Sequence, residues 1–404
     1  MKKIDGNICA PKGFSAAGIY CGIRKNPNKK DLALIFCDKE CSAAAVYTQN
    51  KVFGAPIVVT RKHLADGHAR AVICNSGNAN TCNTDGVEKA DMMGRFVADT
   101  CGVDEDDVIV ASTGVIGQTL DVTPISAAMG KLKESLSDSD GTAAAEAIMT
   151  TDKKVKALSY EFEVGGKACR IGAISKGSGM IHPNMATMLC FITTDAAIAP
   201  PILQKALNAV VADTFNMISV DGDTSTNDMV TILASGLAGN EEITECGAEY
   251  DEFGAALLGL CTEMAKLMAS DGEGADKLLE CRVTGAESIE DAKLVARAVI
   301  SSSLFKAAMF GADANWGRVL CAAGYSGAAF DPAKVEVAFS SKAGSVTVCK
   351  KGGGCGFSEE LAKKVLSESE VTTNIDLGGG DGEAAAWGCD LTYDYVKING
   401  DYRS

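Results

Sequence analysis

Aromatic residues and histidine are scarce in this sequence. Only 6% of the 404 residues are aromatic, and the three histidines are His63, His68 and His182. So few histidines leave little material for a histidine-based zinc site or a Ser-His-Asp triad. Positive charge is also in short supply, because the formal net charge is −15. Nucleic acids and anionic membranes bind basic surfaces, so we expect neither as a partner.

Long apolar runs and paired cysteine motifs are missing as well. No run reaches the roughly 18 apolar residues that a membrane-spanning helix needs, and the N-terminus, MKKIDGN, lacks the apolar centre of a signal peptide. The 16 cysteines show neither CxxC nor zinc spacing. We therefore expect a cytoplasmic protein without a metal, whose cysteines are reduced and mostly buried.

Helical and strand patterns alternate along the chain. Helices are predicted at 124–136, 202–215, 251–268, 289–299 and 358–366. Strands are predicted at 32–37, 56–60, 70–74, 107–111, 168–174, 188–194, 229–233, 333–338, 344–349 and 391–398. This interleaving predicts an α/β or α+β protein with layered sheets. The length favours two domains, and DGEG at 271–274 suggests a main domain of 1–280 and a smaller one of 281–404.

Five segments are dense in small and polar residues. They are NSGNAN (75–80), STGVIG (112–117), TTD (150–152), KGSG (176–179) and SVDGDTSTND (219–228). Each alone reads as a turn. Their recurrence at the ends of apolar strands favours a functional site, because loops at strand ends are where sites are built. No phosphate-binding GxxxxGK[ST] motif is present.

Thr187 stands where a glycine-containing loop (177–186) enters an apolar strand pattern (188–194). A threonine hydroxyl becomes a good nucleophile only with a base beside it. Cleavage of the Ala186–Thr187 bond would supply that base as the new α-amine of Thr187. The alternative is an ordinary threonine that begins a strand.

Two further segments suit acyl transfer. Thr113 and Gly114 follow a predicted strand and can offer a hydroxyl and a backbone N–H side by side, as an oxyanion hole requires. Lys176, with an ordinary pKa of about 10.4, is a poorer base at pH 7 than an α-amine of about 7.7–8.0. Lys176 is therefore better suited to hold a substrate carboxylate.

Taken together, these motifs resemble those of the ornithine acetyltransferase family, also called glutamate N-acetyltransferase, of arginine biosynthesis. The resemblance spans nearly the whole chain. It rests on the polar segments above and on PNMATM (183–188), DGEG (271–274), FGADANWGR (310–318) and WGCDLTYDYVKIN (387–399). The PNMATM segment is the most specific of these.

The resemblance implies a self-cleaving enzyme. The precursor would break between Ala186 and Thr187 into an α chain (1–186) and a β chain (187–404), which assemble as α2β2. Thr187 would take the acetyl group from N-acetylornithine and pass it to glutamate in a ping-pong cycle, with Thr113 and Gly114 as the oxyanion hole. The implied fold is an α–β–β–α sandwich of the N-terminal-nucleophile type with a smaller C-terminal domain.

The family's substrate contacts match residues spread along the chain. They are Thr150, Lys176, Thr187, Glu273, Asn399 and Ser404. The chain departs from the family pattern in its glycine loop at 378–380, which lacks an expected arginine, and at Ala314, where proline is common. No cofactor is implied, and the sequence leaves open whether acetyl-CoA is a second acetyl donor. A self-processing aminopeptidase or amidase of related fold and an unprocessed binding protein are the alternatives.

Overall fold

The computed structural model describes residues 1–182 and 188–400, and the chain folds into two compact units. The first unit comprises residues 1–177, 184–215 and 224–264. The second comprises residues 178–183, 216–223 and 265–404. Each unit contains its own β-sheet with helices against it, which confirms the predicted α/β class with layered sheets.

A nine-stranded sheet forms the frame of the first unit. Its strands are β1 (Lys2–Lys3), β2 (Phe14–Ile19), β3 (Leu32–Tyr47), β4 (His68–Asn78), β5 (Val108–Val115), β6 (Lys156–Val164), β7 (Lys167–Lys176), β8 (Leu189–Thr194) and β10 (Met229–Ala234). The order across the sheet is β1-β6-β7-β8-β10-β3-β4-β5, and β2 pairs with β3.

Strand β3 turns a corner and so belongs to two β-layers. Its first half pairs with β2 and β4, its second half pairs with β10, and the register to β4 is interrupted between Phe36 and Cys41. One hydrophobic core contains side chains from both halves, among them Ile35 and Ala43, together with Val72 of β4 and Phe191 of β8. The two layers therefore face each other across a shared interior.

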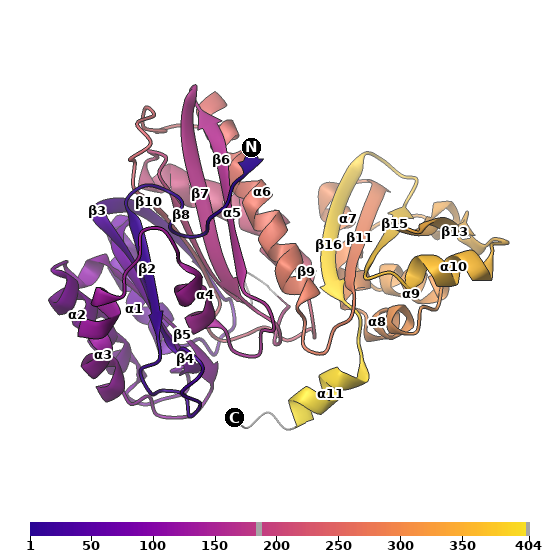
Figure 1. Ribbon diagram of the computed structural model, residues 1–404. Coiled ribbons are helices and arrows are strands. Elements are labelled where there is room, and N and C mark those ends of the chain that lie inside the picture. Colours follow the sequence, from indigo (N-terminus) through magenta and orange to yellow (C-terminus); the bar gives the residue numbers. More distant parts are fainter. Residues whose placement is uncertain (183–187, 401–404) are drawn as a thin grey trace. The chain divides into compact units, whose positions relative to one another are not determined.

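Helices cover the outer faces of these layers (Figure 1). They are α1 (Ala55–His63), α2 (Gly86–Cys101), α3 (Thr123–Glu134), α5 (Pro200–Asp213) and α6 (Ala248–Ser270), whereas α4 (Thr142–Ile148) lies against the core between the layers. Side chains of α2 and α3 form a second core with Leu32 and Leu34, which alternate along β3 with the inward-facing Ala33 and Ile35. Helix α5 packs on β3, and Phe253 of α6 lies 6.2 Å from Phe162 of β6 between ring centroids. The predicted α–β–β–α layering is thereby confirmed, with the short helix α4 contributing to the interior core.

The second unit contains a seven-stranded sheet. Its strands are β9 (Ile218–Ser219), β11 (Leu278–Ala286), β12 (Glu336–Ser341), β13 (Gly344–Lys350), β14 (Gly353–Gly354), β15 (Glu370–Asp376) and β16 (Gly382–Cys389). Its helices are α7 (Ile289–Ser301), α8 (Ser303–Phe310), α9 (Trp316–Gly324), α10 (Glu359–Leu366) and α11 (Tyr393–Gly400). Helix α7 packs on β11 and β16, and α10 packs on β12 and β13.

The compact units do not divide at residue 280, where the sequence suggested the domain boundary. The second unit already begins at Ala265, within α6. Strand β11 (Leu278–Ala286) lies between β15 and β16, so a boundary at residue 280 would cut through this strand. The short strand β9 pairs with β16 and adds residues 216–223, far earlier in the chain.

Two predicted strands are wrong. Residues 56–60 lie in helix α1, which has Pro56 in its first turn, a position where the fixed φ of proline favours a helix. Residues 391–398 lie mostly in helix α11. In contrast, the helix predicted from the Ser288 capping box is confirmed, because the Ser288 hydroxyl accepts a hydrogen bond from the Asp291 N–H at 3.0 Å.

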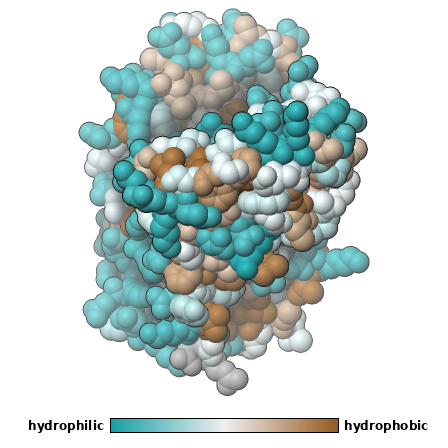
Figure 2. Space-filling model, turned by 90° about the vertical axis from the view of Figure 1, so that its right-hand side faces the viewer, coloured by the Kyte–Doolittle hydropathy of each residue, from teal (hydrophilic) through white to brown (hydrophobic). Residues whose placement is uncertain are grey.

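Helix α6 is the only helix within residues 1–182 and 188–400 with the length and composition of a membrane span. Its most apolar window has a mean hydropathy of 1.2 and is 50% buried, and a core helix of a folded domain passes the same test. On the face of the molecule seen in Figure 2, apolar and polar residues are interspersed.

Adjacent leucines on α6 allow a matched test of the α6 packing. Leu257 is fully buried, whereas Leu258 is 40% exposed. Leu257→Ala should lower the free energy of unfolding by about 2–5 kcal/mol, because it opens a cavity. Leu258→Ala changes helix propensity equally, so it should alter stability by less than about 1 kcal/mol. Urea denaturation of both variants tests this, and equal effects would contradict the packing described.

Candidate active site

The polar segments of the first unit converge where the two β-layers end. Strands β4 and β5 are parallel, so the segments that follow Asn75 and Ser112 emerge side by side. The end of β7 and the starts of β8 and β10 lie side by side in the other layer. They reach the same edge, because Asn227, just before β10, bonds Ala79 after β4 and Ser112 of β5. This edge is the candidate active site.

The Asn227 carboxamide connects the two layers at this edge. Its Nδ2 donates to the carbonyl oxygens of Ala79 (2.6 Å) and Ser112 (3.0 Å). Its Oδ1 accepts from the hydroxyls of Thr81 and Thr226, each at 2.6 Å. A buried amide with both of its ends bonded is a rigid support, so the carbonyl just before Thr113 is held in a fixed direction.

Gly114 occupies a position that only glycine fits. Its φ is +136°, and a Cβ there would lie 2.3 Å from the carbonyl carbon of Gly77. Next to it, Thr113 is 9% exposed. Ser112, one residue earlier, is anchored by a 2.6 Å hydrogen bond from its hydroxyl to Asn75 Oδ1. The predicted Thr-Gly pair therefore lies on an ordered backbone, as preorganised donors require.

A buried carboxylate organises the loop that carries Thr150. Asp152 accepts hydrogen bonds from the Thr150 N–H (2.9 Å), the Gly177 N–H (2.7 Å) and the Lys156 ammonium (2.8 Å). Burial alone would raise the pKa of Asp152, but the positive charges of Lys176 and Lys156 and the hydrogen bonds outweigh it and hold the pKa well below its usual value. The carboxylate thus places Thr150 beside the end of β7.

Lys176, the last residue of β7, is nine-tenths buried at this edge. Its charge lowers the pKa of Asp152 and offsets part of the burial that raises the pKa of the Cys74 thiol to about 12. Among residues 1–182 and 188–400, the Lys176 ammonium makes no hydrogen bond or ion pair, whereas Lys156 is bonded to Asp152. A buried ammonium in that position can receive a carboxylate from a ligand.

The second unit places two other predicted residues together. Glu273 is 7% exposed, and its carboxylate accepts a 2.8 Å hydrogen bond from the Asn399 amide of α11. The Glu273 N–H also donates to the Ser178 carbonyl at 2.9 Å. A Cβ at Gly179 would lie 2.4 Å from the Glu273 carboxylate, so glycine is needed where this chain segment passes the carboxylate.

Three predicted residues lie outside the described part of the chain: Ala186, Thr187 and Ser404. The residue after Thr187 is described. Met188 is 2% exposed, and its carbonyl accepts a 2.9 Å hydrogen bond from the Met229 N–H at the start of β10. The chain therefore enters β8 at the same edge as Thr113, Thr150 and Lys176.

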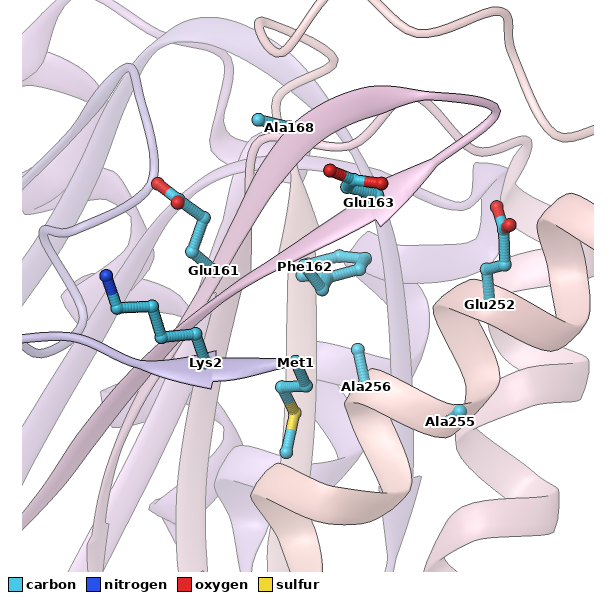
Figure 3. A pocket seen from close by; sticks show the side chains of 9 residues that line it. All are labelled: Met1, Lys2, Glu161, Phe162, Glu163, Ala168, Glu252, Ala255 and Ala256. Atoms are coloured by element: carbon cyan, nitrogen blue, oxygen red, sulfur yellow. The ribbon is translucent and has the colours of Figure 1, made fainter.

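A separate pocket of about 490 Å³ lies beside the N-terminus (Figure 3). The sticks there show Met1, Lys2 and Phe162 among the carboxylates of Glu161, Glu163 and Glu252. None of the predicted site residues that the structure describes lines it. The edge described above is thus the better candidate for the chemistry.

The ArgJ family model matches residues 15–404. The chain is 50% identical over 406 residues to the arginine biosynthesis bifunctional protein ArgJ of Symbiobacterium thermophilum, with 100% of both chains covered. It is 49% identical over 399 residues to ArgJ 1 of Clostridium acetobutylicum, with 98% of each covered. This chain belongs to the ArgJ family. Membership in ArgJ confirms the family that the motifs resembled and the prediction of an enzyme, an acyltransferase, in arginine biosynthesis.

Two solved structures match parts of the chain. The crystal structure of ArgJ from Bacillus halodurans is 47% identical and covers 54% of this chain and 100% of its own, with a TM-score of 0.50. The ornithine acetyltransferase of Mycobacterium tuberculosis, solved with ornithine, is 31% identical and covers 46% of this chain and 98% of its own, with a TM-score of 0.41.

Sequence reasoning missed three residues of the edge in this ArgJ chain. Asn227 and Asp152 were inside polar segments without a role, and Lys156 was not singled out at all. The only available signal was the spacing of Asp152 and Lys156, four residues apart. Nothing in the sequence indicates that this pair is buried.

Loss of the Asp152 carboxylate should destabilise the protein. Asp152→Asn leaves the 1%-exposed Lys156 without its buried counterion, which typically lowers the free energy of unfolding by about 3–5 kcal/mol. Since folding lowers the pKa of Asp152, its contribution is full above the unfolded value of about 3.9 and is lost as the pH falls below it. Urea denaturation at pH 7 and near pH 3 should show the difference between wild type and variant shrinking.

Asp138→Asn, at an exposed position, is the matched control and should change stability little at either pH. An Asp152→Asn variant as stable as Asp138→Asn at pH 7 would contradict this role of the carboxylate.

Proposed function

We propose that this enzyme transfers an acetyl group from N-acetylornithine to glutamate through an acetyl ester on Thr187. The observation that carries the proposal is the set of residues that meet at one edge of the first unit in this ArgJ chain. An ordered Thr113-Gly114 pair, the buried Lys176 and the entry to β8 directly after Thr187 lie there together. They supply an oxyanion hole, a carboxylate partner and a nucleophile.

The nucleophile is made by self-cleavage. The Thr187 hydroxyl attacks the Ala186 carbonyl carbon, the acyl group moves from nitrogen to oxygen, and water hydrolyses the ester. Ala186 then carries a carboxylate and Thr187 a free α-amine. The solved Bacillus halodurans chain supports this, because all of it matches 54% of the present chain, which is the share that residues 187–404 make up.

The α-amine of Thr187 then serves as the base in both halves of the transfer. It accepts the hydroxyl proton as Thr187 attacks the acetyl carbonyl, and the proton passes to the ornithine nitrogen as the amide bond breaks. The amine of glutamate next attacks the acetyl ester, and the Thr187 oxygen leaves with a proton. Thr113 and Gly114 stabilise the oxyanion in each half.

Substrate recognition uses the remaining predicted residues. Lys176 binds the α-carboxylate that ornithine and glutamate share, and Thr150 lies on the loop that Asp152 holds next to it. Glu273, supported by Asn399, binds the ornithine ammonium, and Ser404 completes the contacts. The curated relatives are named bifunctional, and we extend this to acetyl-CoA as a second acetyl donor. The processed chains assemble as α2β2 in the cytoplasm, and no cofactor takes part.

Self-cleavage is tested by a denaturing gel. Purified wild-type protein should give two bands, one for residues 1–186 and one for 187–404. Thr187→Ala should give a single full-length band, because the attacking hydroxyl is gone. A single band for the wild type would exclude self-processing, and two bands for Thr187→Ala would assign the cleavage to another residue or to a protease.

The oxyanion role of Thr113 is tested with a substitution that keeps side-chain volume. Thr113→Val should reduce kcat for glutamate-dependent deacetylation of N-acetylornithine by about 10²–10³-fold, since one donor is lost. The melting temperature should change little. Acetate release without glutamate would instead indicate a hydrolase.

Thr231→Val on β10 is the control. The Thr231 hydroxyl is buried, and it has no hydrogen-bond partner within the described residues. This variant should retain wild-type kcat. A similar loss of kcat in both variants would contradict the role given to Thr113.

A further inference from the structure

A second cluster of chemically active side chains lies at the opposite end of β5 from Thr113. His63 ends α1, Asp91 lies on α2, and Glu105 lies in the 3-10 turn η2 (Glu105–Asp107) that leads into β5. One ligand atom of each, an imidazole nitrogen or a carboxylate oxygen, lies within 4.8 Å of the other two.

The imidazole of His63 is set in one tautomer. Its ring is buried, at 1% exposure, and Nδ1 lies 2.7 Å from the carbonyl oxygen of Val108. A carbonyl oxygen only accepts, so Nδ1 carries the hydrogen and Nε2 of the neutral ring keeps its lone pair. Metal-binding histidines commonly donate their other N–H to a backbone carbonyl in this way.

The Nε2 atom is the unusual feature. It is buried, and no hydrogen bond to it is present in the part of the chain that the structure describes. Gly94 brings α2 close to the ring, since a Cβ there would lie 3.3 Å from His63 Cε1. Buried polar atoms nearly always have a partner. The carboxylate oxygen of the exposed Asp106 lies 3.7 Å from Nε2, beyond hydrogen-bond distance, and a carboxylate oxygen each from Asp91 and Glu105 lies within 4.8 Å of an imidazole nitrogen of His63.

We propose that His63, Asp91 and Glu105 form a binding site for a divalent cation of the first transition row, with water completing its coordination. One imidazole nitrogen and two carboxylate oxygens suit Zn²⁺ or Mn²⁺. Arg95 binds the Glu105 carboxylate at 3.1 Å and orients it, while the exposed Asp106, 3.7 Å from Nε2, adds negative charge.

The role of the cation is structural. Strand β5 is the last strand in the order of the nine-stranded sheet, and on its other side no strand of the described residues pairs with it. Thr60 of α1 already bonds this strand, because its hydroxyl donates to the Val110 carbonyl at 2.8 Å and accepts from the Val110 N–H at 2.9 Å. A cation on His63, Asp91 and Glu105 would join α1, α2 and the start of β5.

Manganese is the first probe, because it favours oxygen and nitrogen ligands over the thiolates of this cysteine-rich chain. Chelator-treated wild-type enzyme, with both chains present, is titrated with Mn²⁺, and free Mn²⁺ is followed by electron paramagnetic resonance. One equivalent should bind, and the melting temperature should rise with Mn²⁺ concentration, since the folded state alone holds the ion. The same shift with Zn²⁺ is measured after the exposed thiols of Cys82, Cys246 and Cys321 have been alkylated.

Variants of the two partly buried carboxylates test whether this cluster binds the ion. Asp91→Asn and Glu105→Gln should each weaken binding at least tenfold and abolish the rise in melting temperature. Asp99→Asn, an exposed position on the same helix, removes the same charge and should bind as wild type does. His63→Gln should bind no ion.

Two results would overturn the site. One is the absence of any saturable equivalent in the wild type. The other is equal binding by wild type, Asp91→Asn and Glu105→Gln. If His63→Gln does not fold, the two carboxylate variants still decide, because their side chains are only partly buried.

Discussion

The carboxamide of Asn227 is the contact on which the candidate active site depends. It bonds the ends of β4 and β5 in one β-layer to the start of β10 in the other. All four of its hydrogen bonds are made within a buried setting. The bridge fixes the backbone next to Thr113 relative to the start of β10, which pairs with β8, and catalysis by preorganised donors requires such fixed positions.

Three charged side chains lie close together at this edge: Asp152, Lys156 and Lys176. Asp152 is bonded to Lys156, and the second nearby ammonium, that of Lys176, adds positive charge without a hydrogen bond to any of the described residues. A single buried carboxylate thus supports two cations and two backbone N–H groups. The burial of Lys176 is tolerable because a negative charge is close, and its ammonium is still available to a ligand.

The fold class and the layering followed from the sequence because apolar periodicity and capping are local signals, as at Ser288. The strand predicted at residues 56–60 is wrong, because the preference of β-branched residues for strands depends on their surroundings. Here Pro56 starts a helix, and Thr60 and His63 bond the edge strand from it. Motifs located Thr113, Thr150 and Lys176, but not Asn227, whose partners Ala79 and Ser112 are 148 and 115 positions away.

The order of strands in the first sheet determines whether the two fragments would stay together after cleavage behind residue 186. Strands β7 and β3 precede that point, and β8 and β10 follow it, yet β7 pairs with β8 and β3 pairs with β10 along six residue pairs each. The two fragments would share one sheet and one hydrophobic interior. Separating them would require breaking both sets of strand pairs, so the fold does not depend on the peptide bond after residue 186 to hold the fragments together.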